Sequence, residues 1–368
     1  MQQFQVRKDD FMAQRLVTLS SEEEHATLAD GEIRLSVDSF SFTANNITYA
    51  AAGDKLGYWQ FFPPVGEQPL GWGVIPVWGF ANVTESRCEQ VPVGERLFGY
   101  FPPATQLIMQ PTHISAQRLV DGSAHRSKLP PGYNSYSRVL HEPTYDPKTE
   151  PERMLLWPLH ITSFCLWDAL KDKDWRGAKQ VIILSASSKT SAGLGYALFK
   201  DPDAPATVAV TSARNIALVK SLDIYDGVVD YEQLSNINKD IPSVIVDMSG
   251  NSAVLNALSK HLGDNLNYCI NVGLTHWDET QTASDISQER REFFFAPGHI
   301  QQRMKDWGPQ GFAEQSQSFM HKAASWSRQW LKVKTLHGLT GLAEIYPDVC
   351  QGRIAADEGV IITLDANS

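Results

Sequence analysis

Short apolar runs alternate with amphipathic segments through the middle of the chain. Four of these runs occupy residues 180–187, 206–212, 243–250 and 266–273, and the first reads "QVIILSAS". The segments between them carry apolar residues at helical spacing. Because a strand buried on both faces reads as a continuous apolar run, this order predicts a doubly wound parallel sheet, the α/β architecture of nucleotide-binding domains. We place it at residues 153–308.

The first 150 residues follow a different pattern. Residues 31–42, "GEIRLSVDSFSF", alternate apolar and polar side chains at the period of a half-buried strand. A polar, proline-containing stretch at 145–154 is a candidate linker to the α/β domain. The last apolar run, at residues 359–364, has no evident strand partner nearby in the sequence. We therefore expect residues 1–152 and 309–368 to share one β domain.

The turn after the first apolar run is rich in small and hydroxyl side chains. Backbone N–H groups at the start of a helix attract anions, and small residues let a ligand approach the backbone. We predict that this turn binds the phosphates of a nucleotide. A plain turn capped by one serine is the alternative, but it would need a single hydroxyl. The candidate residues are Ser187, Ser188, Lys189, Thr190 and Ser191.

This turn matches neither common phosphate motif. A lysine–threonine pair resembles the tail of a P-loop, but the glycine positions of that motif hold Ile183 and Ser188. The glycine pattern of dinucleotide-binding turns is also incomplete. The next strand ends without the acidic residue that binds the ribose of NAD. Ser212 and Arg214 stand there instead and, with Lys189, predict NADP(H) as the cofactor. A solvated arginine in the first turn of a helix is the alternative for Arg214.

Two later turns are further candidates for contacts with the cofactor. In a parallel sheet, ligands bind at the carboxyl ends of the strands. The turns that follow the third and fourth apolar runs contribute Ser249, Gly250, Val272 and Gly273.

Composition restricts the class of partner. The chain has 368 residues and a net charge of −10, without a basic run, so nucleic acid is not expected as a partner. No run of about 18 apolar residues is present to cross a membrane, and the N-terminal residues lack the apolar region of a signal peptide. The four cysteines are scattered and form no C-x-x-C pair. We expect a cytoplasmic protein that acts on a small molecule.

The order of these parts resembles the medium-chain dehydrogenase/reductase superfamily, in its zinc-independent quinone oxidoreductase and enoyl reductase branch. The similar segments are residues 31–54, 91–100, 159–170, 210–234 and 339–363. The resemblance implies a GroES-like β-barrel domain formed by both chain ends, with a Rossmann domain between them. It also implies that NADPH delivers hydride to an α,β-unsaturated carbonyl compound, a quinone or an enoyl thioester.

The sequence departs from this family at two motifs. The family's A-x-x-G-G-V-G turn is replaced by serine-rich residues 187–191. The stretch that corresponds to the G-H-E zinc site of alcohol dehydrogenases reads "IPVWGFANVTES", so we expect no metal. Residues 112–150 form an insertion rich in tyrosine.

Without zinc, another group must donate to the carbonyl oxygen and supply a proton. Tyr49 stands where reductases of this family often place a catalytic or substrate-contacting tyrosine, and Asn45 and Asn46 are candidate amide donors. A buried barrel tyrosine and a turn-forming asparagine are the alternatives. Thr162 lies in the segment that approaches the nicotinamide in the family, although a helical threonine often bonds its own backbone. A predicted aromatic wall comprises Tyr58, Trp59, Tyr133 and Tyr136.

Other functions stay open on the same fold. One is a carbonyl or alcohol oxidoreductase, and another is a protein that binds NADPH without catalysis. Residues 291–297, "REFFFAP", are expected to form an aromatic edge strand. Because an exposed edge of this kind invites pairing with another chain, we expect a homodimer.

Overall fold

The computed structural model describes residues 1–20, 27–273 and 286–364. The chain forms two units, one made of Met1–Leu155 with Lys332–Ser368 and the other of Leu156–Leu331. The expected boundary at residue 308 is therefore wrong, because it falls inside helix α8 (Ala296–Ser327). That helix stays with the second unit because Phe312 packs in a core cluster with Phe164 and Leu194.

The second unit contains a six-stranded sheet in the order β13-β12-β11-β14-β15-β16. Every neighbouring pair is parallel. Counted from β11, this is the 3-2-1-4-5-6 order of a doubly wound Rossmann sheet, which confirms the predicted fold class. The strands are β11 Gln180–Leu184, β12 Ala206–Thr211, β13 Gly227–Asp230, β14 Ser243–Asp247, β15 Leu266–Val272 and β16 Arg291–Phe294.

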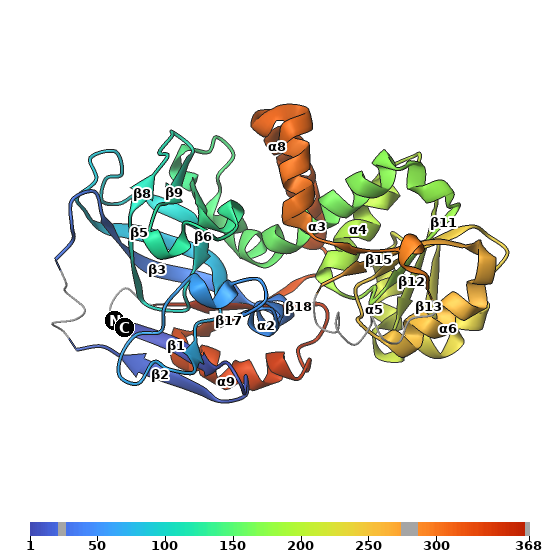
Figure 1. The fold of residues 1–368 in the computed structure, drawn as a ribbon, viewed down its shortest axis with the longest axis horizontal. Helices are drawn as coiled ribbons and strands as arrows, with labels where there is room; N and C mark the ends of the chain where they lie inside the picture. The colour runs from blue at the N-terminus through green and yellow to red at the C-terminus, as the bar shows by residue number, and fades with distance from the viewer. Residues whose placement is uncertain (21–26, 274–285, 365–368) are drawn as a thin grey trace. The chain divides into compact units, whose positions relative to one another are not determined.

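Helices cover this sheet, as Figure 1 shows around strands β11 to β15. Alternate residues of β11 enter different core clusters: Val181 and Ile183 join one, and Ile182 and Leu184 join the other. This division explains the continuous apolar run, since both faces of the strand are buried. No helix among the described residues is long and apolar enough to span a membrane. The covering helices are α3 Glu150–Asp172 (beyond Leu155), α4 Lys189–Lys200, α5 Ile216–Ser221, α6 Ser252–Leu262 and α8.

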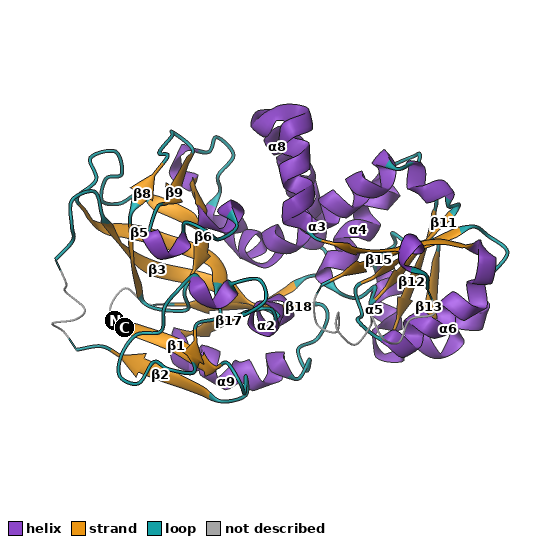
Figure 2. Cartoon of the chain, in the orientation of Figure 1, coloured by secondary structure: helices purple, strands orange, loops and turns teal. Residues whose placement is uncertain are grey.

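The first unit is built mainly of antiparallel strands (Figure 2). A nine-stranded sheet runs β17-β18-β3-β5-β6-β10-β9-β8, with β7 paired to β3, and a smaller sheet runs β2-β1-β4. The strands are β1 Gln2–Arg7, β2 Gln14–Thr18, β3 Ile33–Phe42, β4 Trp72–Gly73, β5 Val77–Ser86, β6 Arg96–Phe101, β7 Gln106–Met109, β8 Pro111–Thr112, β9 Arg118–Asp121, β10 Ser135–Arg138, β17 Lys332–His337 and β18 Glu358–Thr363. Two helices, α2 Ala44–Ala51 and α9 Gly338–Cys350, belong to the same unit.

Both chain ends build the main sheet of this unit. Strand β18 pairs antiparallel with β3, with Ile362 opposite Phe40, which confirms that the C-terminal run returns to the N-terminal domain. Sequence analysis missed β17, which pairs parallel with β18. Its sequence, "KVKTLH", is largely exposed and carries no apolar periodicity, so no pattern marked it.

The two glycines of helix α4 allow close packing within the second unit. A Cβ at Gly193 would lie 2.6 Å from Ser163 Oγ and 2.7 Å from His160 Cδ2, both on helix α3, and a Cβ at Gly195 would lie 2.6 Å from the ring of Tyr225. His160 is buried in this contact, and burial lowers its pKa to about 3, so its ring is neutral. Gly193 therefore lets α4 approach α3 closely, and Gly195 does the same for the ring of Tyr225.

Replacing Gly193 with alanine tests this packing. We expect Gly193→Ala to lower the free energy of unfolding by about 1–3 kcal/mol, because the added methyl group overlaps two side chains of α3. Gly298→Ala is the matched control in helix α8, since its Cβ would meet only Phe295 Cδ1, at 3.9 Å. Urea unfolding measures both variants. An equal loss in the two would contradict the packing role.

Candidate functional site

The turn between β11 and α4 is held by its own hydroxyl groups. Ser188 is the N-cap of α4, and its Oγ accepts the backbone N–H of Ser191 at 3.1 Å. The Ser188 hydroxyl also donates to Ser191 Oγ at 2.8 Å. Ser191 is completely buried, and its hydroxyl contacts Met248 Sδ at 3.1 Å. Ser191 therefore organises the turn, while the half-buried side chains of residues 187–190 lie at its surface.

A serine occupies the sharp bend where dinucleotide-binding turns commonly carry glycine. Ser185, directly after β11, has φ of 58°, in the left-handed region. A non-glycine residue pays about 1–2 kcal/mol for this conformation. Its N–H donates to the Tyr231 hydroxyl at 3.1 Å, which helps to hold the bend. The chain thus turns sharply at Ser185 although the glycine pattern of dinucleotide-binding turns is incomplete.

Ser187 joins this turn to the end of the neighbouring strand β12. Its Oγ accepts from Asn215 Nδ2 at 2.9 Å and from Thr211 Oγ1 at 3.3 Å. Ser212 and Arg214 lie between these two donors in the sequence, and the arginine is exposed. The structure therefore brings the predicted phosphate turn and the predicted 2′-phosphate residues together at one edge of the sheet.

The ends of β14 and β15 meet at the same edge. Asp247 Oδ1 accepts from the backbone N–H and the hydroxyl of Ser249, at 2.8 and 2.7 Å, while its Oδ2 accepts from Asn271 Nδ2 at 3.2 Å. Asp247 is therefore a structural residue that shapes both turns. Gly250 and Gly273 have φ of 62° and 89°, so the chain turns at each of them, and Val272 is the last residue of β15.

Helix α3 contributes Thr162 beside the start of α4. Thr162 Oγ1 donates to the carbonyl oxygen of Pro158 at 3.3 Å, so its hydroxyl is bonded within its own helix. The next residue, Ser163, donates to the carbonyl oxygen of Thr190 at 2.7 Å. This bond fixes the segment around Thr162 against the first turn of α4.

These features fit the phosphates of a dinucleotide. The first turn of a 12-residue helix opens at the carboxyl edge of a parallel sheet, where N–H groups and the helix dipole favour an anion. Half-buried Ser187, Ser188, Lys189 and Thr190 surround that position and supply hydroxyl groups and a cation.

Tyr49 belongs to helix α2 in the first unit, and the helix start explains the residues around it. Thr43 is the N-cap, and its backbone N–H donates to Asn46 Oδ1 at 2.8 Å in a capping box. Asn46 Nδ2 donates to the carbonyl oxygen of Pro76 at 2.9 Å. Asn46 is thus buried, and both the oxygen and the nitrogen of its side-chain amide are hydrogen-bonded. Its role is therefore structural. The turn expected at the asparagines is the start of helix α2. Asn45, unlike Asn46, directs its amide to Tyr49.

The Tyr49 hydroxyl receives two hydrogen bonds. Asn45 Nδ2 donates to it at 2.8 Å, and Trp78 Nε1 donates at 3.1 Å. Burial raises the pKa of Tyr49 above the usual value of a phenol, and these two bonds partly oppose that shift. The hydroxyl therefore stays protonated at neutral pH. In both of these bonds the Tyr49 oxygen is the acceptor, so neither of them uses its own proton.

Tyr49 lies in a cluster of aromatic rings, which we call the tyrosine cluster. Its ring centroid lies 4.8 Å from that of Tyr58, 5.4 Å from Tyr100 and 6.2 Å from Tyr133. The predicted aromatic wall thus contains Tyr58 and Tyr133, whereas Tyr136 packs on Phe101 and Trp59 near Phe11. Sequence analysis missed Trp78 and Tyr100, because no spacing in the sequence connects α2 with β5 and β6. It named Asn45 as an amide donor, and the structure shows that this amide donates to Tyr49, four residues further along the same helix.

Metal-ligating side chains do not gather in the part of the chain that the structure describes. Within residues 1–20, 27–273 and 286–364, no three His, Cys, Asp or Glu side chains are placed to hold a metal ion.

Comparison with known proteins places this geometry in a family and a fold. Residues 40–355 match a family model described as "Protein of unknown function (DUF2855)". A search of curated proteins by sequence finds no match.

Solved structures share the fold over nearly the whole chain. CurA from Vibrio vulnificus in complex with NADPH aligns with a TM-score of 0.63 and 12% identity, covering 99% of both chains. A mutant enoyl thioester reductase from Candida tropicalis gives 0.57 and 11%, covering 98% of this chain and 99% of its own. The mycobacterial Rv1454c complexed with NADPH gives 0.56 and 12%, covering 99% of both. At this identity the likeness shows the fold alone.

Proposed function

We propose that this chain, which belongs to the family described as "Protein of unknown function (DUF2855)", is an NADPH-dependent reductase of a conjugated carbonyl compound. The substrate class is an α,β-unsaturated carbonyl compound, a quinone or an enoyl thioester. The observation that carries the proposal is the start of α4, where a hydroxyl-rich helix terminus opens at the carboxyl edge of a Rossmann sheet. Two structures of the same fold were crystallised with NADPH, which supports the choice of cofactor.

The residues at this edge of the sheet would hold the cofactor. Residues 187–190 would bind its pyrophosphate through hydroxyl and N–H groups. The buried Ser191 would hold the turn through its bonds with Ser188. Arg214, Ser212 and Lys189 would bind the 2′-phosphate, because no acidic residue stands at the end of β12 to repel it. Contacts further along the edge would come from Thr162, Ser249, Gly250, Val272 and Gly273. When bound, NADPH supplies a hydride.

Tyr49 would act on the carbonyl group of the substrate. Reduction of an enone adds a hydride to the β-carbon and a proton to the α-carbon, and negative charge collects on the carbonyl oxygen in between. A protonated phenol whose oxygen already accepts two bonds has its proton available for that oxygen. Asn45 and Trp78 also stabilise the negative charge that grows on the phenol oxygen as it donates. We therefore assign Tyr49 as hydrogen-bond donor and candidate general acid.

Two other functions fit the same fold. A carbonyl or alcohol oxidoreductase would use the same phenol as proton donor. A protein that binds NADPH without catalysis would need the α4 turn but would not need the Tyr49 hydroxyl. Substrate-dependent oxidation of NADPH separates the two classes, since a binding protein shows none.

We also infer that the protein is a homodimer through strand β16. This strand is the last of the six-stranded sheet, paired only with β15 among the described strands, and its Phe294 is buried. The outermost strand of a sheet is a template for pairing with a second copy. Light scattering at micromolar concentration is expected to give the mass of two chains. The mass of one chain would refute this arrangement.

The choice between NADPH and NADH is tested at Arg214. We expect Arg214→Ala to weaken NADPH binding about tenfold, because a charge-assisted contact with the 2′-phosphate is lost. NADH, which lacks that phosphate, should bind the variant and the wild type within about twofold of each other. Lys260→Ala, at the far end of α6, is the control for general loss of positive charge. Fluorescence titration measures all affinities, and tighter binding of NADH by the wild type would contradict the assignment.

The catalytic assignment is tested by Tyr49→Phe. We expect kcat for NADPH oxidation with an enone, quinone or enoyl thioester to fall on the order of a hundredfold, as when a general acid is removed. NADPH affinity should not change, because Tyr49 is not among the residues proposed to hold the cofactor. Tyr346→Phe is the matched control, a buried phenol that donates to the carbonyl oxygen of Phe11. Equal rates in the two variants would remove Tyr49 from the mechanism.

A further inference from the structure

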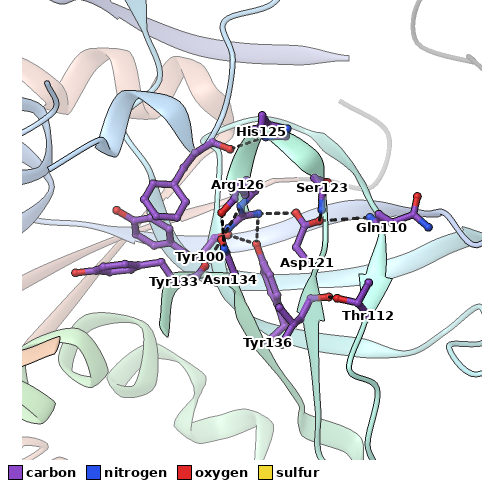
Figure 3. A network of polar contacts seen from close by, with 12 residues as sticks. Tyr100, Gln110, Thr112, Asp121, Ser123, His125, Arg126, Tyr133, Asn134 and Tyr136 are labelled. Atoms are coloured by element: carbon purple, nitrogen blue, oxygen red, sulfur yellow. Dashed lines mark hydrogen bonds and ion pairs between the residues drawn. The ribbon is translucent and has the colours of Figure 1, made fainter. Parts of the chain in front are cut away.

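One fully buried arginine, Arg126, ties the inserted segment 124–136 to the main sheet of the first unit (Figure 3). Its Nη1 donates to Asp121 Oδ2 at 2.7 Å and to the Tyr136 hydroxyl at 2.9 Å. Its Nε donates to Asn134 Oδ1, and its Nη2 donates to the backbone carbonyl oxygen of Tyr133, both at 2.9 Å. All three guanidinium nitrogens are therefore bonded. We call this set of contacts the Arg126 network.

The partners of Arg126 also donate hydrogen bonds of their own. Asn134 Nδ2 donates back to the carbonyl oxygen of Arg126 at 3.0 Å, and the Tyr136 hydroxyl donates to the carbonyl oxygen of Tyr100 at 2.5 Å. The guanidinium carbon also lies 4.9 Å from the ring centroid of Phe62. A buried charge of this kind holds its surroundings in one geometry, because any displacement leaves a charge or a polar group without its partner.

The Arg126 network positions Tyr133 so that its ring packs in the tyrosine cluster. The backbone of Tyr133 is fixed by Arg126, whereas its ring turns toward Tyr100, with centroids 4.8 Å apart. Its hydroxyl lies 3.0 Å from the hydroxyl of Tyr58. The ring also lies within 6.2 Å of Tyr49. A residue of the insertion thus completes a cluster that otherwise comes from α2, β5, β6 and the turn at Tyr58.

The Tyr58–Tyr133 hydroxyl pair has one proton that its own hydrogen bond does not use. Two hydroxyls that share one hydrogen bond use one proton between them, whichever of Tyr58 and Tyr133 donates. The other proton stays available, as does that of Tyr49. Burial raises the pKa of all three phenols, so each keeps its proton through neutral pH. The cluster therefore offers two phenolic donors, and the ring centroid of Tyr49 lies 4.8 Å from that of Tyr58 and 6.2 Å from that of Tyr133.

We propose that the Tyr58–Tyr133 hydroxyl pair is a second hydrogen-bond donor to the substrate's carbonyl oxygen, beside Tyr49, and that Arg126 is the positioning residue that holds this pair in place. This proposal rests on the proposed function and names a further part of that site. Two donors aimed at one oxygen stabilise the charge that develops there better than one does. The insertion that carries Tyr133 is then a functional addition to the barrel.

The side chains around the pair indicate the class of substrate. The rings that pack on Tyr133 are uncharged and aromatic, namely Tyr49, Tyr58, Phe61, Trp78 and Tyr100. Such rings favour the flat face of an uncharged conjugated molecule. An aryl enone or a quinone therefore suits this cluster better than a charged thioester of coenzyme A does.

The experiment compares phenol deletions in the full-length protein with NADPH. Benzylideneacetone, menadione and crotonyl-coenzyme A represent an aryl enone, a quinone and an enoyl thioester. Tyr58→Phe and Tyr133→Phe are each expected to lower kcat/KM several-fold, since one hydroxyl remains. The double variant should lose on the order of a hundredfold for the first two substrates, as when an oxyanion donor is deleted. Tyr346→Phe, which removes a hydroxyl that donates to the backbone carbonyl oxygen of Phe11, should match the wild type.

Arg126→Lys tests the positioning role. It keeps the positive charge beside Asp121 but cannot make all four bonds of the planar guanidinium. We expect kcat/KM to fall as in Tyr133→Phe while NADPH affinity is unchanged. Alkaline absorbance titration gives a readout apart from activity. The bond from Tyr133 lowers the pKa of Tyr58, so both Tyr133→Phe and Arg126→Lys should move that phenol to higher pH.

The outcomes separate the two proposals. If the wild type oxidises NADPH with none of the three substrates, the proposed function itself fails. If the wild type is active and the double variant is as fast as Tyr346→Phe, the second donor is refuted while the proposed function stands. If Arg126→Lys leaves both kcat/KM and the phenol titration unchanged, Arg126 is not the positioning residue. Should Arg126→Lys not fold, the phenol variants still decide the role of the pair.

Discussion

Burial of a parallel sheet on both faces is the constraint on which the second unit depends. Parallel strands need helical crossovers, and the helices must cover both faces of the sheet. Every strand then ends at the same edge, so the turns after β11, β12, β14 and β15 become neighbours. The bonds from Ser187 to Asn215 and from Asp247 to Asn271 join these turns directly. The candidate cofactor site follows from the sheet before any ligand is considered.

Serines stand in this turn where dinucleotide-binding turns commonly carry glycine. Ser185 takes the left-handed conformation that a glycine would adopt freely, and Ser188 and Ser191 bond each other at the start of α4. The glycines that remain, Gly193 and Gly195, face side chains of the same unit at distances too short for a Cβ. Hydrogen bonds between hydroxyl groups thus hold this turn. Glycine occurs in α4 where packing leaves no room for a Cβ.

In the first unit, the buried charge of Arg126 orders the aromatic rings. The strands of this unit provide Trp78 and Tyr100, and helix α2 provides Tyr49, but Tyr133 comes from an insertion with little regular structure. An irregular segment needs strong local bonds to keep one conformation, and the bonds of Arg126 to Asp121, Asn134 and Tyr133 supply them. The aromatic cluster and the ion pair therefore depend on each other.

Apolar periodicity was sufficient to predict the parallel sheet, the helix after the serine turn and the return of the C-terminal strand, because it reports burial directly. The assignments of Tyr49, Ser188 and Arg214 rest on chain order and stay proposals. Tertiary contacts were needed to show that Asn46 belongs to a helix cap, that Asn45 and Trp78 donate to the Tyr49 hydroxyl, and that α8 stays with the Rossmann unit. The tertiary structure also revealed β17 and the Arg126 network. These features depend on contacts between residues far apart in the chain, for which local spacing carries no signal.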